Sequence, residues 1–218
     1  GAAAGQGKNI LFEAQLGALR DIDYGIYPFT SSSNTIASYA PIGAGIPGCA
    51  LDNVVGVMKA YSTCVGEGPF VAETAMGEAW NEKLRESGGE FGAATGRPRR
   101  VGPFDAVASR YGIRCQKAQD IALTKLDVLG AFDKIPVITG YRLHGVLLDS
   151  FPTDSRLEEA EPVIEELPGW ECDISGCRSW KDLPENARKY VCTLEKLVDH
   201  PIYLVSTGAE RDAYLLRE

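Results

Sequence analysis

The chain has 218 residues, of which 44% are hydrophobic and 24% charged, and its formal net charge is −8 at pH 7. This length and composition are typical of a soluble globular protein with one domain, or with one domain and a small appendage. The acidic balance argues against a nucleic-acid-binding face, and no apolar run approaches the ~20 residues that cross a bilayer. We therefore expect no nucleic acid and no membrane among the partners, and a cytoplasmic location.

The first half of the chain alternates short apolar runs with segments rich in glycine and proline. Residues 1–8 predict a helix end or an unstructured lead-in, and the apolar run 9–13 predicts a short buried strand. Residues 19–35 predict a loop, and residues 40–48 are too rich in glycine and proline for a regular element. The other expected elements of this half are a short helix or strand at 52–59, a strand at 59–65, a surface helix at 76–85 and a helix at 104–112.

The second half predicts a regular alternation. A buried strand begins at residue 120 and ends in polar residues by 129. After it come expected strands at 135–139 and 145–148, an acidic stretch at 158–166, an amphipathic helix at 184–198 and a final strand at 202–205. Strands that alternate with helices predict an α/β fold, with a mainly parallel sheet and flanking helices.

Cysteine and histidine do not form a metal-binding pattern in this chain. Cys172 and Cys177 are the closest pair of the six cysteines, but they lack C-x-x-C spacing, and neither of the two histidines lies near them. The sequence therefore predicts reduced thiols and no metal site within the chain.

A glycine-rich segment, residues 92–102, concentrates positive charge; we call it the arginine loop. Arg97, Arg99 and Arg100 follow the hydroxyl-bearing Thr95. Guanidiniums pair bidentately with carboxylates and phosphates, and glycine lets a ligand approach the backbone closely. In an acidic protein this loop predicts a small-anion site, with a solvated basic turn as the alternative.

Lys125-Leu126-Asp127 follows the first strand of the second half. Ligands collect at the carboxyl ends of strands in open parallel sheets. The Asp127 carboxylate can accept hydrogen bonds from the N1–H and exocyclic amine of guanine, whereas adenine presents the opposite pattern. The Lys125 stem can lie across the base. An ordinary charged strand end is the alternative.

Two further segments offer groups for anions. Ser206-Thr-Gly208 follows the expected final strand, and its backbone amides could hold a carbonyl oxygen or a phosphate, although such a turn is also common after a strand. The segment 29–35 carries five hydroxyls, which suit phosphate or simply a turn. Asp21 and Asp23 could recruit Mg²⁺ or orient this loop, and we favour loop orientation because Mg²⁺ mostly needs the phosphates of its ligand.

The chain lacks the sequence patterns of the common catalytic sites. It contains no G-x-S-x-G elbow, no Cys/His pair in a convincing context and no G-x-x-x-x-G-K-[ST] phosphate loop. We therefore assign no catalytic residue to this chain.

The quoted segments occur together, in order, in one family. From Leu11 to the C-terminus the chain closely resembles adenylosuccinate synthetase, the purine-biosynthetic ligase that joins aspartate to IMP at the expense of GTP. The matching segments include EFGAATGRPRR at 90–100 and LTKLDVL at 123–129, with others at 21–29, 32–34, 59–70, 167–170 and 205–208. The resemblance implies the C-terminal part of that family's P-loop GTPase-like α/β fold. Within residues 1–218 it implies a lead-in at 1–8, an IMP, aspartate-loop and guanine-recognition region at 9–130, and a C-terminal α/β region at 131–218.

The resemblance also implies binding roles for particular residues. Arg97 matches an arginine that contacts the nucleotide and aspartate, while Thr95 and Arg99 match positions that hold the aspartate carboxylates, with Arg99 also near GTP. The other matched positions are Lys125 and Asp127 for guanine, Ser206 and Gly208 for the turn around guanine, Ser31 for the IMP phosphate and Val65 for the lining of the nucleotide pocket.

Two positions depart from the family pattern. An amide that contacts IMP usually follows Glu-Gly-Ala, but here Leu16 takes that position and Gln15 lies one place earlier. Either the loop shifts so that Gln15 serves, which we favour, or one IMP contact is lost. Cys64 replaces a residue that is commonly arginine in bacterial members, which puts a local charge contact in doubt.

Family members are longer, and the chain matches only their C-terminal half. The resemblance implies that the GTP-phosphate loop, the catalytic aspartate and histidine and the Mg²⁺ ligands belong to the other half. In the family mechanism that aspartate deprotonates N1 of IMP, O6 attacks the γ-phosphate of GTP, and the amine of aspartate then displaces phosphate from 6-phosphoryl-IMP. We therefore expect a fragment that is inactive alone and that is part of a homodimer when the full-length chain is present.

Two other functions are compatible with these residues. One is a non-catalytic guanine-nucleotide-binding module, which the intact Thr95, Arg97 and Arg99 disfavour. The other is a variant synthetase that acts on a 2-amino purine nucleotide, for which the altered Gln15-Leu16 region leaves room.

Overall fold

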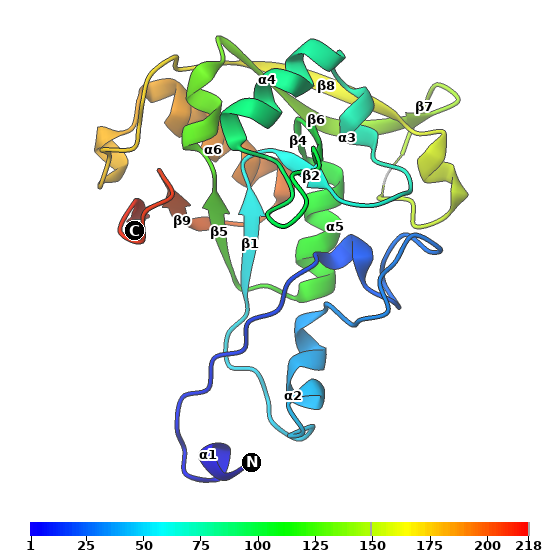
Figure 1. Ribbon diagram of the computed structural model, residues 1–218, viewed down its shortest axis with the longest axis vertical. Coiled ribbons are helices and arrows are strands. Elements are labelled where there is room, and N and C mark those ends of the chain that lie inside the picture. Colours follow the sequence, from blue (N-terminus) through cyan, green and yellow to red (C-terminus); the bar gives the residue numbers. More distant parts are fainter. Residues whose placement is uncertain (149, 218) are drawn as a thin grey trace.

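The computed structural model describes residues 1–148 and 150–217. Its central sheet has the strand order β1-β5-β9-β10, as Figure 1 shows in part. The strands are β1 (Val55–Lys59), β5 (Asp120–Thr124), β9 (Ile202–Ser206) and β10 (Tyr214–Leu216). The first three are parallel, and β10 pairs with β9 in the antiparallel sense. The strands predicted to begin at residues 120 and 202 are confirmed. The segment 52–59, expected as a short helix or strand, contains the strand β1. The strand at 202–205 is not the last one, because β10 follows it.

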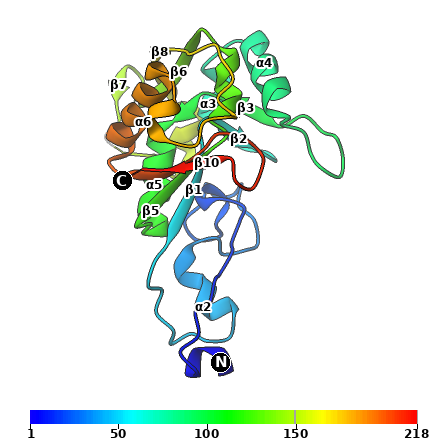
Figure 2. The same ribbon diagram turned by 90° about the vertical axis from the view of Figure 1, so that its left-hand side faces the viewer.

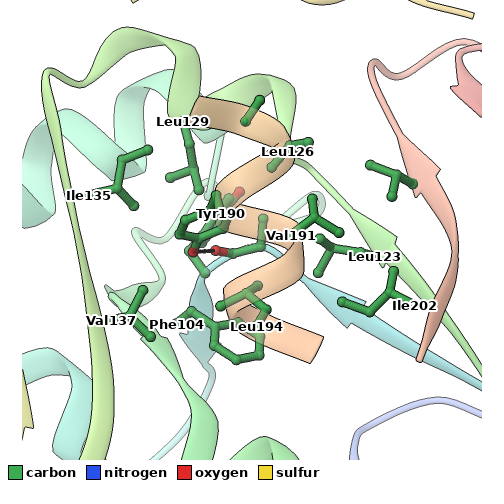
Figure 3. Packing of buried hydrophobic residues seen from close by; sticks show 14 of the residues in the cluster. Phe104, Leu123, Leu126, Leu129, Ile135, Val137, Tyr190, Val191, Leu194 and Ile202 are labelled. Atoms are coloured by element: carbon green, nitrogen blue, oxygen red, sulfur yellow. Dashed lines mark hydrogen bonds between the residues drawn. The ribbon is translucent and has the colours of Figure 1, made fainter. Parts of the chain in front are cut away.

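Helix α6 (Glu185–Val198) covers the central sheet and confirms the predicted amphipathic helix. Its buried side chains recur every three or four residues and include Tyr190, Val191 and Leu194. Figure 3 shows them packed beside Leu123 of β5 and Ile202 of β9. The Tyr190 hydroxyl also donates to the carbonyl of Ala60 at 2.7 Å, which joins the helix to the end of β1.

A second sheet lies beside the first. It consists of β4 (Phe104–Asp105), β6 (Lys134–Leu143), β7 (Val146–Leu147) and β8 (Glu161–Pro168). β4 is parallel to β6, whereas β7 and β8 are antiparallel to it. The predicted strands at 135–139 and 145–148 are confirmed, but the acidic stretch at 158–166 was not predicted as a strand. Most of β8 is exposed, and its glutamates hide the usual apolar signal of a strand.

Two longer helices and a small ribbon complete the body. α4 (Glu78–Gly88) confirms the surface helix, and α5 (Ala106–Gln116) begins two residues later than predicted, because Asp105 pairs in β4 and caps the helix. β2 (Ser62–Cys64) pairs with β3 (Arg100–Gly102). The short helical segments are α1 (Ala2–Gly5), η1 (Ala18–Arg20), η2 (Ala37–Tyr39), α2 (Ala40–Gly43), α3 (Val71–Thr74), η3 (Asp127–Ala131), η4 (Ser155–Glu158) and η5 (Trp180–Asp182).

Residues 1–16 and 40–52 form an arm that extends from the α/β body (Figures 1 and 2), whereas the segment between them packs against α5 and buries Asp21 and Ile26. The strand predicted at 9–13 is wrong, because no strand of the described residues pairs with it and Leu11 is 94% exposed. A strand is stable only when its backbone amides find partners, and an apolar run alone does not supply them. Residues 40–48 contain the short helix α2, which Pro41 can start at its first turn, so the prediction of no regular element there is also wrong.

The predicted fold class is confirmed: helices flank a central sheet that is mainly parallel. All six cysteines are free thiols. Among the described residues, no helix is both long and apolar enough to cross a membrane.

Candidate functional site

The parallel strands bring the predicted guanine-binding residues to one edge of the sheet. Lys59 at the end of β1 is the register partner of Thr124 at the end of β5, and Leu123 is paired with Val205 of β9. Lys125–Asp127 and Ser206–Gly208 therefore leave the sheet at the same edge. The structure thus brings these two segments together as the strand-end argument predicted, although it does not test what they bind.

Lys125 has an unusual backbone and a fixed ammonium group. Its φ is 63°, in the left-handed region that disfavours most residues with a side chain. Its Nζ donates to the carbonyl of Gly88 at 2.7 Å and lies 3.9 Å from Oε1 of Glu90. The lysine therefore leans from the end of β5 toward the end of α4.

Asp127 begins η3 and is half-buried. Burial raises the pKa of its carboxyl group, and the nearby Asp173 adds to this effect, while backbone hydrogen bonding and the charge of Lys125 oppose it. The carboxyl group therefore takes up a proton at a higher pH than an ordinary aspartate. Hydrogen-bond donors from a ligand would favour its ionised form.

The turn after β9 is held in place by its own side chains and by a loop before η5. Ser206 Oγ donates to the carbonyl of Gly208 at 2.9 Å, and buried Thr207 donates to the carbonyl of Cys177 at 3.2 Å. A side chain at position 208 would lie 3.2 Å from Cβ of Ala213 and 3.8 Å from Cβ of Ser175. Gly208 therefore sits where there is little room for a larger residue.

The arginine loop is a hairpin that projects from the body between α4 and β3 (Figure 2). Within it, Gly92 N–H donates to the carbonyl of Arg97 at 2.8 Å, and the carbonyl of Gly92 accepts from Gly96 N–H at 2.7 Å. Thr95 Oγ1 accepts from Arg97 N–H at 3.3 Å. Thr95 and Arg97 are exposed, so their side chains are accessible to a ligand.

Arg99, at the exit of the loop, is bound to a buried carboxylate that the sequence analysis did not single out. Glu90 is 1% exposed and accepts from Arg99 Nη1 at 2.8 Å, from Lys59 Nζ at 2.8 Å and from the Tyr61 hydroxyl at 2.6 Å. Burial would raise the pKa of Glu90, but hydrogen bonds from Lys59 and Tyr61 lower it overall. Glu90 and Lys59 lie in the quoted motifs, but their contact joins positions far apart in the chain.

Lys59 and Tyr61 respond to this environment in opposite directions. Burial lowers the pKa of Lys59, as do the charges of Arg99 and Lys125, although Glu90 opposes this. Burial and the hydrogen bond to Glu90 raise the pKa of Tyr61 above its ordinary value, which keeps the hydroxyl protonated as a donor.

Ser31, predicted to bind the IMP phosphate, is linked through Arg20 to the two residues Cys64 and Glu67 that flank the Val65 segment. Ser31 N–H and Oγ donate to the carbonyl of Arg20 at 2.8 and 2.9 Å. The Arg20 guanidinium donates to Sγ of Cys64 at 2.8 Å and to the carbonyl of Glu67 at 2.9 Å. Val65 itself is 71% exposed. A guanidinium therefore lies beside Cys64 even though position 64 is not arginine.

Gln15 and Leu16 lie in the exposed arm before η1. Leu16 has a φ of 85°, a strained value for a leucine, and Gly17 follows with a φ of 87°. The carbonyl of Gly17 accepts from Thr35 Oγ1 at 2.9 Å, which ties this turn to the hydroxyl-rich segment. Whether Gln15 replaces the missing amide stays a prediction.

Asp21 confirms the prediction that it orients the loop. It is fully buried, and its two oxygens accept from four backbone amides, those of Asp23, Tyr24, Thr35 and Ile36. Burial would raise its pKa, but these hydrogen bonds lower it overall. Asp23 instead accepts from the Asn34 amide at 2.7 Å.

No group of three or more His, Cys, Asp or Glu side chains in residues 1–148 and 150–217 comes together as a metal site. What the edge of the sheet offers is a concentration of lysine and arginine around one carboxylate, next to a half-buried aspartate. Such an arrangement can bind an anionic ligand that also carries a hydrogen-bond-donating ring.

Comparison with known proteins gives consistent results. The family model described as adenylosuccinate synthetase matches residues 1–215. The curated adenylosuccinate synthetase of Trichlorobacter lovleyi is 51% identical over 211 residues, which are 96% of this chain and 49% of that protein. The corresponding protein of Anaeromyxobacter sp. is 49% identical over 213 residues, 97% of this chain and 49% of its own length. The chain thus spans about half the length of the curated relatives it matches.

Two solved structures are also similar. A fully ligated adenylosuccinate synthetase from Plasmodium falciparum aligns with a TM-score of 0.93 and 36% identity, over 100% of this chain and 52% of the other. A succinoaminodeoxyadenylate synthetase from cyanophage S-2L, bound to dGMP and dATP, aligns with a TM-score of 0.53 and 14% identity over 92% of this chain and 44% of the other. At that identity the second likeness shows a shared fold alone.

Proposed function

The chain belongs to the adenylosuccinate synthetase family, and from this premise we propose that it takes part in making adenylosuccinate from IMP, L-aspartate and GTP. The family is one of GTP-dependent carbon–nitrogen ligases of purine biosynthesis, and GDP and phosphate are the other products. The observation that carries the proposal is the shared sheet edge: Lys125–Asp127 and Ser206–Gly208 leave the sheet there, and Lys125 and Arg99 meet at Glu90.

The guanine base of GTP binds at the ends of β5 and β9 in this proposal. Asp127 accepts hydrogen bonds from N1–H and the exocyclic amine, and adenine is rejected because it cannot donate in the same pattern. The stem of Lys125 covers one face of the base, and the turn at Ser206 and Gly208 holds its carbonyl oxygen. As the pH falls, Asp127 takes up a proton and loses its ability to accept both hydrogen bonds, so guanine binding weakens. Because burial raises the pKa of Asp127, this weakening begins at a higher pH than it would for an exposed carboxylate.

Aspartate and IMP bind on the side of the arginine loop. Thr95, Arg97 and Arg99 hold the aspartate carboxylates, with Arg97 also on the nucleotide and Arg99 also near GTP. Arginine suits this role because its planar fork matches a carboxylate in two hydrogen bonds. Ser31 binds the IMP phosphate, Val65 lines the nucleotide pocket, and Gln15 supplies the amide that Leu16 cannot.

The chemical step needs groups that we do not assign to this chain. Mg²⁺, when bound, neutralises phosphate charge during phosphoryl transfer, and we place its ligands, the phosphate loop and the catalytic aspartate and histidine in the other half of a full-length synthetase. This chain's own part is to select guanine, to hold aspartate and to contribute to the IMP pocket. We further propose a homodimer as the working assembly and the cytoplasm as its location.

A chimera tests the proposal. This chain replaces the matching half of the T. lovleyi synthetase, and adenylosuccinate formation is followed with IMP, L-aspartate and GTP. We expect activity that Arg97→Ala reduces by about a hundredfold, since one charge-assisted contact to substrate is worth about 1.5–3 kcal/mol. Arg114→Ala, at an exposed arginine of α5, is the matched control. A folded chimera that forms no adenylosuccinate contradicts the proposal.

The same chimera separates the alternatives. A non-catalytic nucleotide-binding module would bind GDP without supporting turnover. A chain suited to 2-amino purine nucleotides would bind dGMP in preference to IMP in this chimera, whose catalytic residues come from the T. lovleyi half.

A further inference from the structure

Glu90 is a buried anion surrounded by cations. Its carboxylate is 1% exposed and binds Lys59 and Arg99 directly, with the Lys125 ammonium 3.9 Å away. Three positive groups therefore surround one negative group, with Tyr61 as a neutral donor. One carboxylate does not neutralise three cations, so positive charge remains for an anionic ligand. The carboxylate also holds the cationic side chains in place.

The groups that meet at Glu90 come from separate elements. Lys59 ends β1, Lys125 follows β5 and Arg99 closes the arginine loop. The backbone strengthens the same connection, because Arg99 N–H donates to the carbonyl of Glu90 at 2.9 Å and Gly88 accepts from Lys125. Glu90 is thus the point where the loop and the sheet edge are joined.

Arg99 uses only part of its guanidinium in this contact. Nη1 binds Glu90, whereas the buried Nε has no hydrogen-bond partner among the described residues. An arginine held at one end keeps the rest of its planar fork in a defined direction for a ligand. Arg97, two residues earlier, is exposed, and no described carboxylate binds its side chain as Glu90 binds Arg99.

We propose that Glu90 is a positioning residue that holds Arg99 of the arginine loop and Lys125 of the guanine site in one arrangement, so that guanine binding and the order of the loop are coupled. The inference rests on the proposed function, since it takes Lys125 and Arg99 as ligand-binding groups. Glu90 does not touch the ligand itself. Coupling between two sites is reciprocal, so a guanine nucleotide that favours the bound position of Lys125 also favours the bound position of Arg99.

The experiment uses the whole 218-residue chain and compares GDP with ADP. Calorimetry gives the ratio of the two affinities for the wild type, for Glu90→Gln and for Glu86→Gln, a matched change at an exposed position of α4. Hydrogen exchange of the backbone amides in residues 92–97 is measured with and without GDP.

Glu90→Gln is expected to lower the preference for GDP over ADP by about tenfold, comparable with losing one charge-assisted hydrogen bond. Inorganic pyrophosphate should bind this variant at least as well as the wild type, because the local positive charge has increased. GDP should slow exchange in the loop of the wild type and of Glu86→Gln but not of Glu90→Gln. A purely structural role would weaken all three ligands together.

A second variant decides the matter if Glu90→Gln does not fold. Tyr61→Phe removes one donor to Glu90 without changing any charge, and it should lower the GDP preference by about two- to threefold, in line with one neutral hydrogen bond. If the wild type prefers GDP but the folded variants keep the full preference and the loop protection, the positioning role is wrong and the guanine site stands. If the wild type itself does not prefer GDP, the guanine site is wrong and the positioning role falls with it.

Discussion

The Lys125 ammonium donates a hydrogen bond to the carbonyl of Gly88 at 2.7 Å, so the residue that follows β5 is tied to the last residue of α4. This contact joins the proposed guanine site to the root of the arginine loop. The contact also requires the backbone of Gly88 to lie close to the buried Tyr61, because α4 ends directly beside that side chain.

Gly88→Ala should destabilise the protein. A Cβ at this position would lie 2.5 Å from the Tyr61 hydroxyl oxygen and 3.2 Å from Cγ of Glu90. Overpacking of this kind costs about 1–3 kcal/mol, which urea denaturation measures as a lower midpoint. Gly43→Ala is the control, because Gly43 also ends a helix but has no atom near its Cβ position. Equal midpoints for the two variants would contradict the tight packing at Gly88.

Leu16→Gly should stabilise the protein. Leu16 has a φ of 85° and is 51% exposed, so glycine removes backbone strain and loses little burial. We expect a gain of about 0.5–1 kcal/mol after the greater flexibility of glycine in the unfolded chain is subtracted. Leu11→Gly, at a 94% exposed leucine of the same arm, should give no gain. Thermal unfolding of both variants measures the difference, and a loss of stability for Leu16→Gly would show that the leucine is not strained.

Asp105→Asn should change the pH dependence of stability. Burial raises the pKa of Asp105 to about 6, although the amides of Ala108 and Val107 and the Tyr141 hydroxyl oppose the increase. The folded state therefore binds this proton more tightly than the unfolded state, so stability falls as pH rises from about 3.8 toward about 6.

Asparagine can cap α5 in the same way but has no proton to lose. Asp105→Asn should therefore be more stable than the wild type at pH 8, by up to about 3 kcal/mol, and the difference should vanish near pH 4. Asp212→Asn, at an exposed position, controls for the change in net charge. Parallel stability curves for the wild type and Asp105→Asn between these pH values would contradict the raised pKa.

Val57→Lys should reduce self-association. β1 is an edge strand of the central sheet, and Val57 is 71% exposed on it. An exposed apolar edge can pair with another chain, and lysine on an edge strand opposes such pairing. Light scattering at increasing concentration should show association of the wild type and less of it in the variant. Val65→Lys, at a 71% exposed valine outside the strands, is the control. A monodisperse wild-type monomer would contradict the prediction.

The elements that the sequence predicted well are those whose pattern is local. α6 repeats its buried residues with the period of a helix, and the apolar runs of β5 and β9 are flanked by polar residues. The run at 9–13 is also apolar but pairs with no strand of the described residues, whereas β8 pairs with β6 but exposes its glutamates. Pairing is a property of the fold, so neither outcome could be seen in the run itself.

In the candidate site, too, some residues could be predicted from a local pattern and others depend on contacts that only the fold creates. Lys125 and Asp127 were found because a strand-end rule places them at the sheet edge before any contact is known. Glu90 was not singled out, since its role depends on Lys59, which is 31 positions away in the chain. Asp21 lies between these two cases. A carboxylate in a loop suggested that it orients the loop backbone, but its four amide partners could be identified only from the fold.

The most direct test of the guanine site is calorimetric titration of this chain with GDP, GTP and ATP, in the wild type and in Asp127→Asn. We predict that GDP and GTP bind more tightly than ATP, and that Asp127→Asn abolishes this preference because an amide cannot accept both donors of guanine. Equal binding of all three nucleotides by the folded wild type, or an unchanged preference in Asp127→Asn, would contradict the assignment.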